Sequence, residues 1–101
     1  MATTSKTLFR GAATTNTATT LYTVPSSTTT VVTEIIVTNT AGSAGTFTLA
    51  LNGTNIATTV TVPATDSTVI GMKQPITAAQ TIAGGASATT INFHISGVEI
   101  A

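Results

Sequence analysis

The chain has 101 residues, of which only 6% are charged, and its three basic residues balance its three acidic ones. Ordinary globular domains are about 25% charged, so this chain has few groups for acid–base, nucleophilic or metal chemistry. Its near-zero net charge argues against nucleic acids and anionic membranes as partners, because both attract clustered Lys and Arg. The composition favours a non-enzymatic binding or assembly role, without a cofactor.

The absence of cysteine excludes a disulfide framework and a thiolate metal site. Residues 1–6 have none of the apolar character of a secretory signal, and the longest strongly apolar run, residues 35–37, is far too short to cross a bilayer. We therefore expect a single domain that is made and used in a cytoplasm, or assembled there into something released later.

Residues 1–20 form the first segment, which contains Lys6 and Arg10 but few large apolar side chains beyond Leu8 and Phe9. Such a segment buries little surface by itself, yet it can add to the edge of a neighbouring sheet through main-chain hydrogen bonds. We predict an arm that binds a partner, with Leu8 and Phe9 as anchors and Lys6 and Arg10 meeting carboxylates at the rim. The alternative is an ordinary first strand of the protein's own sandwich.

Residues 21–101 are predicted to form a β-sandwich, because the chain is rich in β-branched residues and alternates with a period of two residues. The Asn52-Gly53 pair is the clearest turn, since both residues tolerate the positive φ of a type I′ hairpin. Seven or eight short strands then predict an all-β fold, a single antiparallel sandwich that is jelly-roll-like or immunoglobulin-like. The expected strands are 6–10, 21–24, 31–39, 46–51, 54–62, 67–73, 80–83 and 89–100.

Alternation within these strands predicts which side chains fill the core. Val31 and Ile35 lie on the other side of the strand 31–39 and are candidates for an interface. The expected core residues are Val32, Ile36, Phe47, Leu49, Leu51, Ile91, Phe93 and Ile95.

The only histidine, His94, is interpreted as a sheet-face or interface residue rather than as a general base. A catalytic triad needs a nucleophile and an orienting carboxylate beside the imidazole. Glu99 follows five residues later and so falls on the opposite face of a regular strand. Only a bulge at Gly97 would bring the two side chains to one face.

Four short motifs give the chain a family resemblance. They read LYTVP at 21–25, VVTEIIVTNT at 31–40, GTFTL at 45–49 and NFHISGVE at 92–99. As a set they resemble the small virion proteins of tailed bacteriophages, over most of the chain from about residue 18 onward. The resemblance implies a β-sandwich that decorates a capsid or sits in the tail, and it brings no catalytic residues.

Between these two roles we rank capsid decoration first, because the chain has neither the heptads nor the long repeats of a fibre. The expected partners are then the major capsid protein and further copies of the chain, with a homotrimer suited to threefold positions on a shell. The expected location is the capsid surface of the virion. The first alternative is a minor tail or fibre-associated protein that contacts the host, and a distant one is a ligand-binding or enzymatic sandwich.

Overall fold

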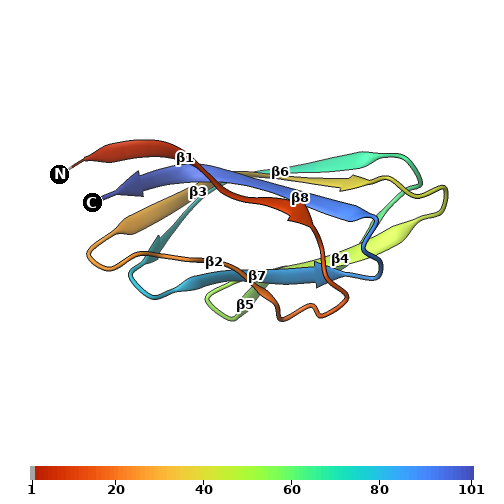
Figure 1. The fold of residues 1–101 in the computed structure, drawn as a ribbon, viewed down its shortest axis with the longest axis horizontal. Coiled ribbons are helices and arrows are strands. Elements are labelled where there is room, and N and C mark those ends of the chain that lie inside the picture. The colour runs from red at the N-terminus through yellow and green to blue at the C-terminus, as the bar shows by residue number, and fades with distance from the viewer. Residues whose placement is uncertain (1) are drawn as a thin grey trace.

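The computed structural model describes residues 2–101, which form eight strands and no helix in two four-stranded antiparallel sheets. The sheets face each other in an elongated sandwich that measures 46 × 21 × 18 Å (Figure 1). This confirms the predicted all-β sandwich. The strands are β1 (Thr3–Ala12), β2 (Thr20–Thr23), β3 (Thr29–Asn39), β4 (Gly45–Leu51), β5 (Thr54–Val62), β6 (Ser67–Thr77), β7 (Thr81–Ala86) and β8 (Ile91–Ile100).

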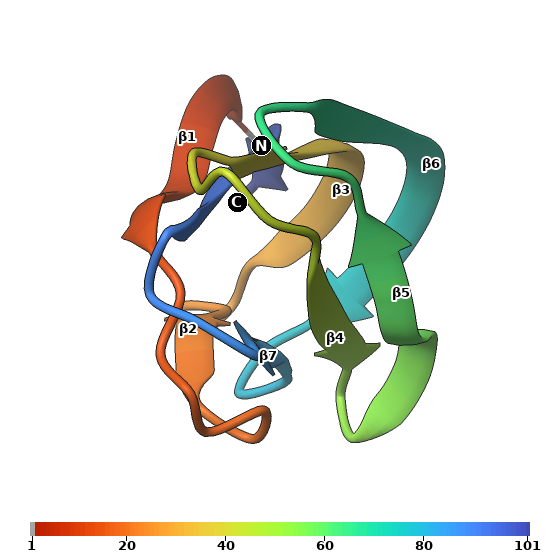
Figure 2. The ribbon, with the colours of Figure 1, turned by 90° about the vertical axis from the view of Figure 1, so that its right-hand side faces the viewer.

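The strand order distinguishes between the two kinds of sandwich that the sequence left open. Sheet A has the order β1-β8-β3-β6 and sheet B the order β2-β7-β4-β5. The first strand therefore pairs with the last, the second with the seventh, the third with the sixth and the fourth with the fifth. This is the topology of a jelly roll, in which one long hairpin rolls up into two sheets (Figure 2).

The tip of that long hairpin is the predicted Asn52-Gly53 turn between β4 and β5. Asn52 has a φ of 48° and Gly53 a φ of 82°, so both residues adopt the left-handed conformation that a type I′ turn requires. The turn prediction is confirmed.

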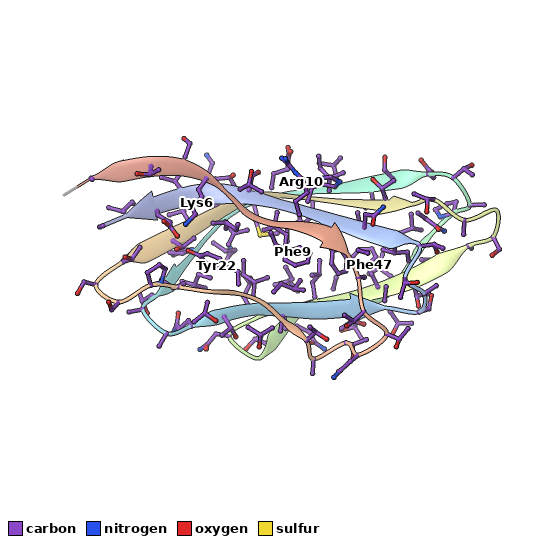
Figure 3. All side chains as sticks on the ribbon, viewed as in Figure 1. Lys6, Phe9, Arg10, Tyr22 and Phe47 are labelled. Carbon is purple, nitrogen blue, oxygen red and sulfur yellow. The ribbon has the colours of Figure 1, made fainter. Side chains whose placement is uncertain are left out.

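The core lies between the sheets, with Phe9 and Phe47 among its side chains (Figure 3). Phe47 of sheet B meets Phe93 of sheet A edge to face, with ring centroids 6.2 Å apart. Seven of the eight predicted core residues are buried, namely Val32, Phe47, Leu49, Leu51, Ile91, Phe93 and Ile95.

The prediction that the eighth residue, Ile36, lies in the core is wrong, because β3 contains an extra residue. Val32 pairs with Gly97 of β8 and Glu34 with Ser96, which leaves Thr33 as a bulge. The bulge reverses the alternation, so Ile35 points into the core and Ile36 onto the outer face. Ile35, which was predicted as an interface candidate, is fully buried.

The N-terminal segment forms strand β1, which pairs with β8 at the edge of the protein's own sheet. This is the second of the two interpretations of residues 1–20. The prediction that Leu8 and Phe9 anchor an arm on a partner is therefore corrected: both side chains pack within their own chain. Leu8 is 8% exposed and belongs to the core cluster, and Phe9 packs against that cluster.

A second bulge, at Leu8 of β1, lies beside the first, because Thr7 pairs with Ser96 and Phe9 with Ile95. Gly97 lies between the bulged strands, but β8 itself keeps its alternation, so the bulges at this level are in its two neighbours and not at Gly97. The carbonyl oxygen of Val31 occupies the position that a Cβ on Gly97 would need.

The bulge at Thr33 can be tested with two neighbouring alanine substitutions. Ile35→Ala should lower the free energy of unfolding by about 2–5 kcal/mol, because it leaves a cavity in the core. Ile36→Ala should change it by less than about 1 kcal/mol, since this side chain lies on the outer face. Urea unfolding of both variants measures the difference, and a larger loss for Ile36→Ala would contradict the described register.

Candidate functional site

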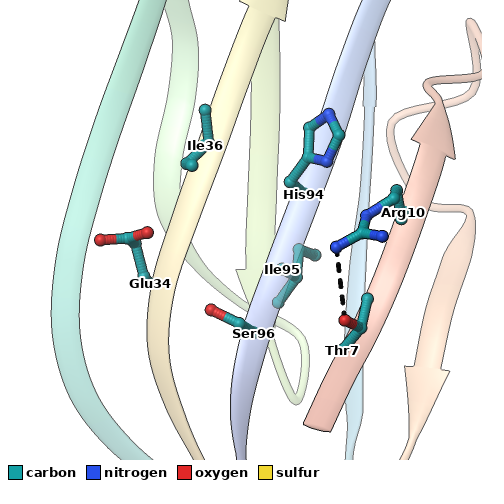
Figure 4. A pocket seen from close by; sticks show the side chains of 7 residues that line it. All are labelled: Thr7, Arg10, Glu34, Ile36, His94, Ile95 and Ser96. Atoms are coloured by element: carbon teal, nitrogen blue, oxygen red, sulfur yellow. Dashed lines mark hydrogen bonds between the residues drawn. The ribbon is translucent and has the colours of Figure 1, made fainter.

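A pocket opens on the outer face of sheet A, across the middle of strands β1, β8 and β3 (Figure 4). Its volume is about 220 Å³. Three of the chain's seven acidic, basic or histidine side chains line it, namely Arg10, Glu34 and His94. The remaining lining residues are Thr7, Ile36, Ile95 and Ser96.

The two bulges build this pocket. Thr7 and Arg10 are three residues apart, so a regular strand would place them on opposite faces. The extra residue in β1 brings both side chains to the outer face, where Thr7 pairs with Ser96 and Arg10 with His94. The bulge in β3 does the same for Glu34, which would otherwise share the inner face with Val32.

The charged ends of the pocket are separated by β8. Arg10 on β1 and Glu34 on β3 flank it at two strand spacings, about 10 Å. Among the seven lining side chains, the one hydrogen bond runs from Arg10 Nη2 to Thr7 Oγ1, at 3.5 Å. Ser96, His94 and Glu34 share this face but are not hydrogen-bonded to one another, so they do not form the geometry of a catalytic triad.

A second cluster of polar side chains lies at the end of the sandwich where both termini are found (Figure 3). Its members are Lys6, Tyr22, Thr30 and Glu99. The Tyr22 hydroxyl of sheet B donates to Glu99 Oε2 at 2.5 Å, and Thr30 Oγ1 donates to the Tyr22 oxygen at 2.8 Å. Lys6 Nζ lies 3.3 Å from Glu99 Oε1. Side chains from β1, β2, β3 and β8 are thereby joined across the two sheets.

This arrangement shifts the pKa values of two of its members. The hydrogen bond from Tyr22, followed by that from Lys6, lowers the pKa of Glu99 below its ordinary value. Burial, together with the hydrogen bond to Glu99, raises the pKa of Tyr22. The pair is therefore held as a carboxylate and a neutral phenol.

The four residues predicted to bind a partner thus separate in the structure. Lys6 meets a carboxylate, but it is that of Glu99 in the same chain. Leu8 and Phe9 contribute to the core, and Arg10 alone remains on an open surface, in the pocket. His94 lies on the outer face of sheet A and Glu99 on the other side of β8, as the alternation of the strand predicts.

Sequence reasoning missed Glu34 as a pocket residue and Tyr22 as a link between the sheets. Glu34 sits in an apolar strand, so its position depends on the bulge, which no local motif announced. Tyr22 bonds residues 8 and 77 positions away in the sequence, a pairing that only the topology creates.

Charge is divided unequally between the two sheets. Strands β2, β4, β5 and β7 of sheet B contain no Lys, Arg, His, Asp or Glu. The edge strand β5 exposes Ile56 and Val60, which are 38% and 36% accessible. The outer face of sheet B consists largely of Thr20, Thr23, Thr46, Thr48, Thr61, Thr81 and Ala83.

The loop formed by residues 13–19 passes over one end of that face. The carbonyl oxygen of Asn16 occupies the position that a Cβ on Gly85 would need, so glycine is required there for the close approach. Asn16 also organises the loop, since its Oδ1 accepts from the Ala18 amide at 2.9 Å and its carbonyl accepts from the Thr19 hydroxyl at 2.8 Å.

In comparisons with known proteins, the chain matches no protein-family model and no curated sequence. Within residues 2–101 there is no group of three or more acidic or histidine side chains placed to hold a metal ion. The same range contains no helix of the length and hydropathy needed to cross a membrane.

The hydrogen bond from Tyr22 should make stability depend on pH. Because the pKa of Glu99 is lowered on folding, its contribution is present above the ordinary glutamate pKa and is lost as the pH falls through the folded value. Tyr22→Phe should therefore cost about 1.5–3 kcal/mol at pH 7 and less at pH 2. Urea unfolding at both pH values checks this, and an equal cost at both would contradict it.

Proposed function

We propose that the protein is a non-enzymatic structural component of a bacteriophage particle, a decoration or minor capsid protein that binds the assembled head. Three features support this proposal. The sequence resembles small phage virion proteins, the jelly roll is a fold that viral capsid domains use, and the chain is poor in chemistry-bearing residues. Fold alone does not imply function, so the surface carries the argument.

The observation that carries it is the uncharged outer face of sheet B. A partner that covers this face removes no charged group from water, so the desolvation cost of association is small. Permanent interfaces between identical subunits are likewise depleted of charge at their centres. We assign this face to the contacts between copies in a homotrimer, because sheet B of every copy is equally uncharged.

A decoration protein of this kind stabilises a shell by mass action. If it binds the assembled shell but not the free subunits, its binding free energy adds to the stability of the assembled state. The protein then needs no catalytic group, cofactor or moving part. It needs a rigid fold, a self-association surface and a surface that recognises the shell.

The two alternatives make different demands on the structure. A minor tail or fibre-associated protein would use the same fold at another place on the particle. A ligand-binding sandwich would need a deep pocket, and small-molecule pockets usually have volumes of about 300–1,000 Å³. The pocket on sheet A, at about 220 Å³, is smaller than that.

Self-association can be tested with one added charge on sheet B. Light scattering should give the wild-type protein three times its 10.1 kDa chain mass at micromolar concentration. Thr81→Lys, on the uncharged face where β7 pairs with β2, should shift it to a monomer because a lone charge would be buried. Ser67→Lys adds the same charge to sheet A and should leave the trimer intact. A monomeric wild type would overturn the assignment.

Location on the particle distinguishes decoration from a tail role. Electron microscopy of virions from the phage that carries the gene should show the protein on the head, at threefold or quasi-threefold positions. Density on the tail would favour the alternative, and virions without the protein would exclude both.

A further inference from the structure

We propose that the pocket on sheet A binds a carboxylate group, and that on the particle this group is an Asp or Glu side chain of a shell subunit. The second part of this inference rests on the proposed function. With sheet B assigned to contacts between copies, the pocket lies on the opposite face of the sandwich, where it is free to meet the shell.

The cationic end of the pocket has unused hydrogen-bonding capacity. The Arg10 guanidinium carries five N–H donors, and its one hydrogen bond within the described chain is the long contact to Thr7. Among residues 2–101 the only ion pair joins Lys6 and Glu99, so Arg10 has no carboxylate partner of its own. A guanidinium whose N–H groups are unoccupied can donate two parallel hydrogen bonds to the two oxygens of a carboxylate.

The residues around Arg10 provide further donors on the same face. His94 is its cross-strand partner, and Thr7 and Ser96 form the adjacent cross-strand pair. Side chains in such pairs have Cβ atoms about 5 Å apart, close enough to contact one small group. The imidazole, two hydroxyls and the guanidinium thus surround a space that suits a single carboxylate.

The size and the charge of the pocket further restrict the kind of ligand that it can bind. A volume of about 220 Å³ accommodates one acidic side chain better than a free small molecule. Glu34 adds a negative charge at the far rim, which disfavours a multiply charged anion such as phosphate or a nucleic acid backbone. The chain holds seven acidic, basic or histidine side chains, and two bulges place Arg10 and Glu34 on the same face as His94, so the arrangement is specific to this face.

The first test uses acetate as the probe and acetamide as its uncharged control. In NMR titrations of the wild-type protein, acetate should shift the side-chain signals of Arg10 and His94 in a saturable way, and acetamide should not. Arg10→Met should abolish the shift at His94, whereas Glu34→Gln should leave it unchanged or strengthen binding. The absence of a saturable shift with acetate, or an equal loss in Glu34→Gln, would overturn the carboxylate site.

The second test measures attachment to heads that lack the protein. Arg10→Met should weaken attachment at least about tenfold, because it leaves the partner's carboxylate unpaired. Arg10→Lys should recover part of the loss, since lysine keeps the charge but not the fork. Arg10 is exposed, so thermal unfolding of the variants should match the wild type.

The outcomes separate this inference from the proposed function. If the wild type binds heads and Arg10→Met binds them equally tightly, the pocket has no role in attachment, and the decoration role is left standing. Wild-type protein that binds acetate but no head would overturn the decoration role and leave the carboxylate site standing.

Discussion

The side-chain alternation of β1 and β3 reverses at the level where both strands flank Ser96 and Gly97 of β8, and this reversal determines the two faces of sheet A. On the inner side it delivers Leu8 and Ile35 to the core. On the outer side it delivers Arg10 and Glu34 to one pocket. The absence of a side chain on Gly97 lets the backbone of β3 approach closely at this point. One local irregularity therefore specifies both packing and the candidate site.

Much of the fold was predictable from the sequence because it depends on local signals. Alternation of apolar residues identified the strands, and the Asn52-Gly53 pair identified the hairpin at the tip of the roll. The strand predicted at 67–73 continues as β6 past Pro75 to Thr77. It does so because β6 is an edge strand, where a missing N–H is tolerated.

The candidate site was less predictable, because it depends on register. A one-residue slip moves every later side chain of a strand to the other face, and no turn residue adjacent to Thr33 or Leu8 marks the extra residue. Glu34 gives the physical hint in hindsight. With strict alternation it would enter the core beside Val32, and burying an unpaired carboxylate is so costly that an irregularity is the better solution.

The two ends of the described chain are joined directly, since the amides of Ala2 and Ala101 each donate to the other's carbonyl, at 2.8 and 2.9 Å. A pulling force applied between these ends would therefore break the hydrogen bonds between β1 and β8 one pair at a time, starting at the termini. A force applied along the strands from opposite ends of the sandwich would instead act on many of the hydrogen bonds between strands at once. The domain should thus resist stretching along its long axis far better than peeling at its ends.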